Sequence, residues 1–257
     1  MTQETLENII GFGFDKISGE IIISLFCMLL IIILSFIVYF KFKNADPTKP
    51  SSGFVLIIET IVEKLESFTV ELMGEKRREF SGYIAAVALY IIFSFFASLL
   101  GLPGPLTYLG CTFSIALCTF GWIHFTAIKN NKWGYFKRFV DPVPQLFPIF
   151  IPINLLSMWA PLLSLALRLF GNALAGFTLM GIVYYYLGEA SSFIFGALIP
   201  GEAASIILPP IITPVLHLYF DVFSGVIQTL IFCMLTMIFV AQEDPEEEIQ
   251  QQLDLTK

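Results

Sequence analysis

The chain has 257 residues, of which 56% are hydrophobic and only 14% are charged, and its mean hydropathy is +0.80. This composition is too apolar for a soluble domain of this size and indicates a membrane protein. The net charge of −7 comes largely from an acidic C-terminal segment, and no basic stretch is long enough to indicate a nucleic-acid-binding protein.

The N-terminal part predicts one membrane span over residues 17–40. Residues 21–40 contain no charged side chain, and a span needs about 20 apolar residues. The preceding segment carries Glu4, Glu7 and Asp15, whereas a cleavable signal begins with positive charge. We therefore expect this segment to remain in the protein as its first span.

Residues 54–73 have a different pattern, which predicts a helix lying on the membrane surface. Apolar residues recur there at helical spacing, while Glu59, Glu63 and Glu66 share another face. The next two spans are predicted at 80–102 and 106–128.

These two spans form a hairpin, because the charge-free stretch from 80 to 128 is about twice the length of one span. The motif GLPGP, beginning at Gly101, breaks it in the middle. Of the 14 basic residues in the chain, 11 lie in the segments 41–78 and 129–138. Because basic loops face the cytoplasm, we expect the N-terminus outside and the C-terminus inside.

Residues 146–187 predict a long helical region of unusual length. As one helix, residues 151–187 would reach about 55 Å, whereas the hydrocarbon core is about 30 Å thick. The helix must therefore tilt steeply or break, and Pro161 offers a break.

The remaining segments are an external connection at 188–210, a last span at 211–241 and an acidic cytoplasmic tail at 243–257. We expect that tail to be solvated, as charged runs are. The predicted fold class is an all-α integral membrane protein with about five spanning helices, a surface amphipathic helix and long tilted helices. It forms a single membrane domain in the lipid bilayer.

Only four residues between positions 142 and 242 are formally charged: Arg168, Glu189, Glu202 and Asp221. The two glutamates fall in the external connection, where water reaches them. Arg168 and Asp221 lie within apolar helical segments, where an ion costs several kcal/mol and marks a functional site.

Each of these two ions belongs to a polar stripe. Ser164 and Asn172 share the helix face of Arg168, and Gln228 shares the face of Asp221 on the last helix. Arginine keeps its proton in proteins, so Arg168 needs water or an anion. Two polar stripes on apolar helices indicate a hydrated path inside the membrane.

Other interpretations of the same residues stay open at this point. Arg168 and Asp221 could form a structural ion pair between two helices, or Arg168 could bind an anion in a stand-alone secondary transporter or ion channel. An intramembrane hydrolase fits poorly, because no nucleophile and base or metal cluster recurs within the spans. His124 and His217 are more typical of interfacial or hydrogen-bonded histidines than of proton relays.

Two segments resemble subunit a of F-type rotary ATP synthases. The sequence PLLSLALRLFGNALAG, at 161–176, is similar to the arginine helix of that family, and HLYFDVFSGVIQTLIFCMLTMIF, at 217–239, is similar to its final helix. The resemblance implies a subunit without a cofactor or nucleotide site, which supplies two aqueous half-channels to a ring of c subunits. It also implies a peripheral-stalk subunit b as a partner, and we expect a bacterial plasma membrane.

The resemblance also assigns roles to single residues. Arg168 would be the essential cation facing the ring carboxylates, with neighbours on its own helix and on the last helix: Asn172, Ser164 and Gln228. Asp221 would exchange protons with the ring, assisted by Glu202. Many members carry a glutamate or histidine nine residues after the arginine, where this chain has Phe177. We expect H⁺ as the coupling ion, although in this family the ring mainly selects between H⁺ and Na⁺.

Overall fold

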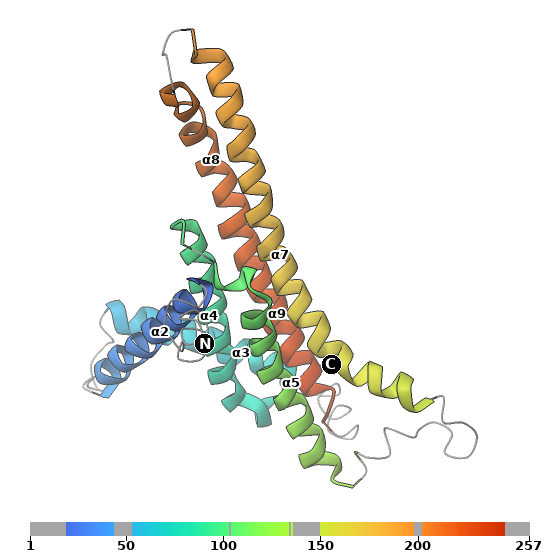
Figure 1. Cartoon of the computed structure of the whole chain (residues 1–257). Coiled ribbons are helices and arrows are strands. Elements are labelled where there is room, and N and C mark those ends of the chain that lie inside the picture. The colour runs from blue at the N-terminus through green and yellow to red at the C-terminus, as the bar shows by residue number, and fades with distance from the viewer. Residues whose placement is uncertain are drawn as a thin grey trace, which may run out of the picture.

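The computed structural model describes residues 19–43, 53–102, 104–133, 135, 150–197 and 202–244. Every regular element in these ranges is a helix, and five helical segments are long and apolar enough to cross a membrane. The predicted all-α membrane class with five spans is therefore confirmed. Figure 1 shows the arrangement, in which two long helices rise side by side from a group of shorter ones.

The shorter helices include the first three predicted spans. Helix α2 (Gly19–Lys43) packs against α4 (Ser81–Leu99), where Ser24 Oγ and Tyr90 Oη share a hydrogen bond of 2.6 Å. The 3₁₀ turn η3 (Pro105–Thr107) then leads into α5 (Leu109–Asn131). The glycines and prolines of this turn region end α4 before α5 begins.

Helix α3 (Gly53–Met73) is amphipathic and packs against the short helix η2 (Glu75–Phe80) and the last helix of the chain. Its apolar side chains divide between two surroundings: Met73 is buried in a core cluster, whereas Ile57 is 60% exposed. Gly74 joins α3 to η2 with a φ of 82°, a conformation that glycine adopts without strain.

Helix α7 (Phe150–Phe195) is continuous over 46 residues, with Pro161 inside it. A helix of that length reaches about 69 Å, so it must cross a 30 Å hydrocarbon core obliquely or extend beyond it. Pro161 therefore does not divide the helix. The helix also continues past the expected end at 187, because residues 188–195 contain one glycine and no proline to stop it.

A second long helix runs back along α7 (Figure 1). It consists of α8 (Pro209–His217), a π-helical segment η5 (Leu218–Phe223) and α9 (Ser224–Ala241). The turn η4 (Glu202–Ile206) packs against α7. Ser191 of α7 fixes this connection, because its hydroxyl donates to the Ala204 carbonyl and accepts from the backbone N–H of Leu208 at 3.2 Å.

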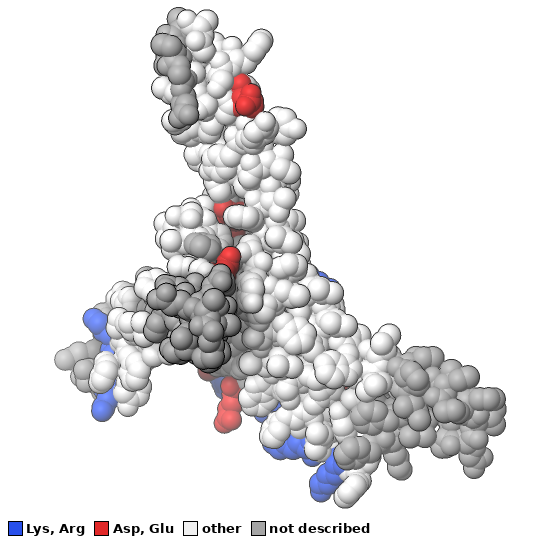
Figure 2. All heavy atoms as spheres, viewed as in Figure 1, with Lys and Arg blue, Asp and Glu red and all other residues white. Residues whose placement is uncertain are grey.

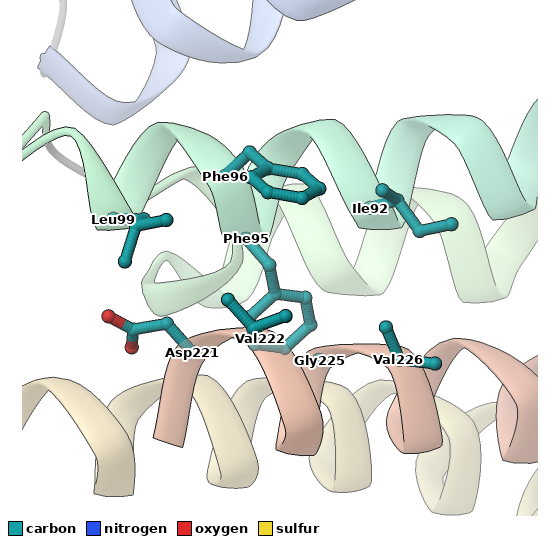
Figure 3. A pocket seen from close by; sticks show the side chains of 8 residues that line it. All are labelled: Ile92, Phe95, Phe96, Leu99, Asp221, Val222, Gly225 and Val226. Atoms are coloured by element: carbon teal, nitrogen blue, oxygen red, sulfur yellow. The ribbon is translucent and has the colours of Figure 1, made fainter. Parts of the chain in front are cut away.

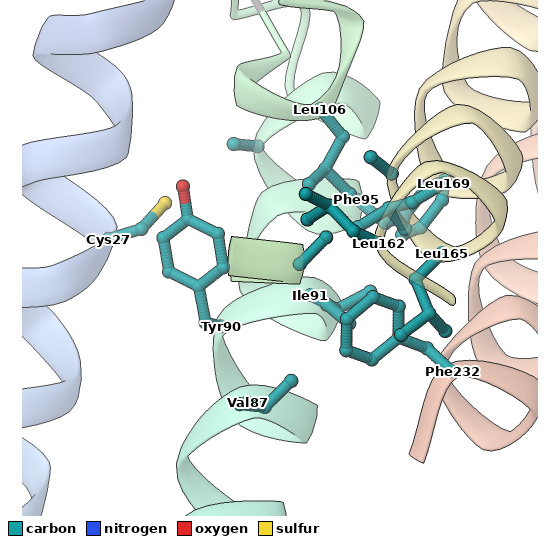
Figure 4. Packing of buried hydrophobic residues seen from close by; sticks show 13 residues of the cluster. Cys27, Val87, Tyr90, Ile91, Phe95, Leu106, Leu162, Leu165, Leu169 and Phe232 are labelled. Carbon is teal, nitrogen blue, oxygen red and sulfur yellow. The ribbon is translucent and has the colours of Figure 1, made fainter. Parts of the chain in front are cut away.

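The main core lies where these helices meet. In Figure 4, Leu162, Leu165 and Leu169 of α7 pack beside Ile91 of α4 and Phe232 of α9. The three leucines follow the helical repeat, so they place one face of α7 in the core and leave its flank open. Arg168 lies on that flank.

Charged side chains gather mainly at one end of the molecule. Figure 2 shows most lysine and arginine atoms towards the lower end, while the long upper part is almost free of charge. At the end of α9, Asp244 Oδ1 accepts from Arg77 Nη2 at 2.5 Å and from Asn130 Nδ2 at 2.9 Å, and Glu243 is 8% exposed. The expectation of a solvated tail is therefore wrong for its first two residues, because they pack against η2 and α5; residues 245–257 lie outside the described residues.

Candidate functional site

Arg168 is exposed on α7, although long apolar stretches flank it in the sequence. Its Nη2 donates to Ser164 Oγ at 3.4 Å, one helical turn away. Within the described ranges it makes no ion pair, and the acidic group of Asp221 contacts a different residue. The guanidinium is therefore a permanent cation without an anion among these residues.

Asn172 lies one turn beyond Arg168 and connects α7 to α9. Its Nδ2 donates to Gln228 Oε1, and Gln228 is only 1% exposed. The structure thus brings together two polar side chains that lie 56 positions apart in the sequence. This contact fixes the polar stripe of α7 against that of α9.

Asp221 lies in the π-helical segment η5, and π-helical turns are rare and frequently occur at functional sites. Its Oδ2 lies 2.5 Å from Nδ1 of His217, one turn earlier. The other ring nitrogen of His217 lies 2.8 Å from the hydroxyl of Tyr184 on α7. A carboxylate, an imidazole and a phenol therefore form one hydrogen-bonded row.

Asp221 also lines two cavities. The first is a narrow cavity between α4 and the η5–α9 helix, as Figure 3 shows. The second lies towards α7 and is lined by Asn172, Phe177 and His217 among others. Phe95 of α4 lines both. The carboxylate thus lies beside a cavity on two sides of its helix.

The other residues singled out in the sequence lie apart from this row or contribute no titratable group. Phe177 lines the second cavity with a side chain that is 66% exposed. Glu202 begins η4, and its side chain lies outside the described residues. His124 of α5 has Nδ1 3.0 Å from the Tyr135 hydroxyl. In the part of the chain that the structure describes, no group of three or more His, Cys, Asp or Glu could hold a metal ion.

The sequence predicted His217 as an interfacial or hydrogen-bonded histidine, and the structure confirms that it is hydrogen-bonded, but the sequence did not single out Tyr184. The contact of His217 with Asp221 could have been predicted, because His217 precedes Asp221 by four positions and so shares its face on a helix. Tyr184 could not be found in this way, since its contact with His217 depends on how α7 packs beside α8.

Together these residues can do two things. The exposed guanidinium can attract an anionic group from outside the chain, and the carboxylate–imidazole pair can exchange protons with the cavities beside it. Arg168 lies on α7 and Asp221 on the long helix that runs antiparallel to it. Along this pair of helices, the Asn172–Gln228 contact lies between the two charged residues.

Comparison with known proteins gives a consistent result. The family model described as ATP synthase A chain matches residues 21–241. The chain is 35% identical to ATP synthase subunit a of Mycoplasma genitalium over 248 residues, which cover 90% of this chain and 84% of that protein. It is 32% identical to ATP synthase subunit a of Mycoplasmoides gallisepticum, with 90% and 82% covered. A sodium ion specific ATP synthase subunit a from Propionigenium modestum is 29% identical, with 85% and 72% covered.

Proposed function

Because the chain belongs to the family of ATP synthase A chains, we propose that it is the ion-translocating stator subunit of a rotary F-type ATP synthase. It carries H⁺ through two half-channels to and from a ring of c subunits. Arg168 separates the half-channels and engages the ring carboxylates. The peripheral-stalk subunit b holds it in place, and the chemistry of ATP occurs on other subunits of the complex.

The observation that carries this proposal is the exposed Arg168 without an anion among the described residues. A permanent cation at membrane depth is costly unless an anion or water compensates it. A carboxylate on a neighbouring subunit supplies that anion. As this carboxylate approaches, the positive charge favours its ionised form and therefore the release of its proton.

The neighbouring residues support separate tasks around Arg168. Ser164 and Asn172 lie one turn before and after it, and Gln228 holds Asn172 from α9. Asp221 lines two cavities and exchanges protons with the ring. Glu202, in the connection next to α7, assists from the outer side.

The charge distribution supports an orientation in the membrane. Basic residues concentrate in the segments 41–78 and 129–138, and such segments face the cytoplasm. The N-terminus is then outside and the C-terminus inside. The relatives named above come from bacteria, which supports the bacterial plasma membrane as the location.

The ring mainly selects the coupling ion, and the surroundings of Asp221 are compatible with H⁺. One of its oxygens already contacts the His217 ring at 2.5 Å. An imidazole can give and take protons, whereas Na⁺ would need the oxygen ligands for itself. One relative is described as sodium ion specific, so the coupling ion of this chain has to be measured. ATP hydrolysis by the purified complex should not depend on Na⁺.

The central experiment is ATP-driven ion pumping by the assembled complex in membrane vesicles. Arg168→Ala should abolish pumping while the complex still assembles. Arg78→Ala is the matched control, because Arg78 is an exposed arginine whose Nε bonds Glu66 at 3.1 Å, away from the site. Pumping by Arg168→Ala at the rate of this control would rule out the mechanism.

A further inference from the structure

We propose that Tyr184, His217 and Asp221 act as one proton relay, in which His217 passes protons between the Tyr184 hydroxyl and the Asp221 carboxylate. This inference rests on the proposed function and adds two residues to it. It makes the imidazole a working group on the ion path, where the sequence predicted an interfacial or hydrogen-bonded histidine.

The distances allow a continuous transfer. His217 Nε2 lies 2.8 Å from Tyr184 Oη, and His217 Nδ1 lies 2.5 Å from Asp221 Oδ2. Both are hydrogen-bond distances. A neutral imidazole has one nitrogen that donates and one that accepts, so each neighbour can be served by a different ring atom.

One transfer can be written with all protons accounted for. The Tyr184 hydroxyl gives its proton to Nε2 and takes one from a hydronium ion, which leaves as water, while the N–H bond at Nδ1 breaks and that proton passes to Asp221 Oδ2. The imidazole ends neutral with its proton on the other nitrogen, and the carboxylate ends protonated. After Asp221 has passed its proton on, loss of the Nε2 proton to water and uptake of one at Nδ1 restores the starting tautomer.

Tyr184 is an exposed residue of α7, whereas the side chains of His217 and Asp221 are 22% and 13% exposed. The row therefore leads from the surface of this chain to a shielded carboxylate. The long helices are joined by the connection between α7 and α8. Tyr184 is nearer to this connection than Arg168 is, and His217 and Asp221 are nearer to it than Gln228 is. The row therefore leads from the external connection towards the arginine.

No other described titratable group lines the cavity beside the pair. The side chains facing it from α4 include Phe95 and Ser98, and those from α7 include Asn172 and Phe177. None of these carries a proton that it could lose near neutral pH. His217 is therefore the second titratable group of this cavity, supplied from the same helix as Asp221.

The test uses the complete ATP synthase complex reconstituted in vesicles, with ATP-driven H⁺ pumping measured across pH. His217→Gln keeps a polar side chain but removes proton exchange. We expect pumping to fall about tenfold or more, and its pH dependence to change. His124→Gln is the matched control, because this histidine of α5 bonds Tyr135, away from Asp221, and its replacement should leave both readouts unchanged.

Tyr184→Phe provides the second variant, since it removes only a hydroxyl from an exposed residue and decides the question if His217→Gln does not assemble. It should lower the pumping rate but keep the pH dependence of the unmodified complex. A normal rate in Tyr184→Phe, or a normal rate and pH profile in His217→Gln, overturns the relay. If Arg168→Ala abolishes pumping in that case, only the relay fails; if Arg168→Ala also pumps normally, the proposed function fails with it.

Discussion

Gly225 of α9 packs closely against Phe95 of α4, and Gly225→Ala should loosen this contact. A Cβ placed on Gly225 would lie 2.7 Å from Cγ and 3.1 Å from Cβ of Phe95, whereas ordinary contacts begin at 3.4 Å. The ring cannot turn away easily, because these atoms are close to the Phe95 backbone. The helices must therefore separate locally by about 0.7 Å.

The expected cost follows from this overlap. Extra volume in a packed core costs about 1–3 kcal/mol, and the better helix propensity of alanine returns about 1 kcal/mol. A net loss of about 1 kcal/mol corresponds to a thermal midpoint about 2–4 °C lower for a chain of this size. Because Phe95 lines both cavities beside Asp221, pumping should slow as well.

The assay compares Gly225→Ala with Gly121→Ala, the same change at an exposed glycine of α5 where a Cβ meets no atom within 4 Å. The purified complex is heated, and the amount of this chain that stays associated is measured against temperature. Gly121→Ala should match the unmodified complex. Equal midpoints for the two variants would refute the close packing of α4 and α9 at Gly225.

Two further predictions concern charged groups at opposite ends of the last helix. Asp244→Ala should make the C-terminal segment more sensitive to protease, because Asp244 binds the partly buried Arg77 at 2.5 Å; Arg78→Ala should not, since its exposed pair is worth about 1 kcal/mol or less. Asp221→Asn should slow H⁺ pumping and change its pH dependence with the complex still assembled, and unchanged rates across pH would remove Asp221 from the path.

The spans could be predicted from the sequence because they depend on local composition. The charge-free stretch from 80 to 128 and the GLPGP motif are sufficient for a two-span hairpin. The amphipathic pattern of 54–73 is likewise local. These features depend on the length and polarity of short segments, and a single sequence contains that information.

Other features depend on packing between distant segments. Pro161 could have ended α7, but Leu162 and Leu165 on its C-terminal side are buried in the core and hold the helix in place. The π-helical segment at Leu218–Phe223 has no signal in the hydrophobic pattern. Predicting that Tyr184 lies beside His217 requires knowing how two helices pack together, and no spacing rule within one helix gives that information.

The most direct test of the central claim measures two ion flows in the same vesicles. One is ATP-driven H⁺ pumping by the whole complex, and the other is passive H⁺ flow through the membrane part after the soluble part has been removed. If Arg168 is the barrier between two half-channels and the partner of a ring carboxylate, Arg168→Ala will lose pumping and still conduct H⁺ passively. Coupled pumping by Arg168→Ala at the rate of Arg78→Ala would contradict the account.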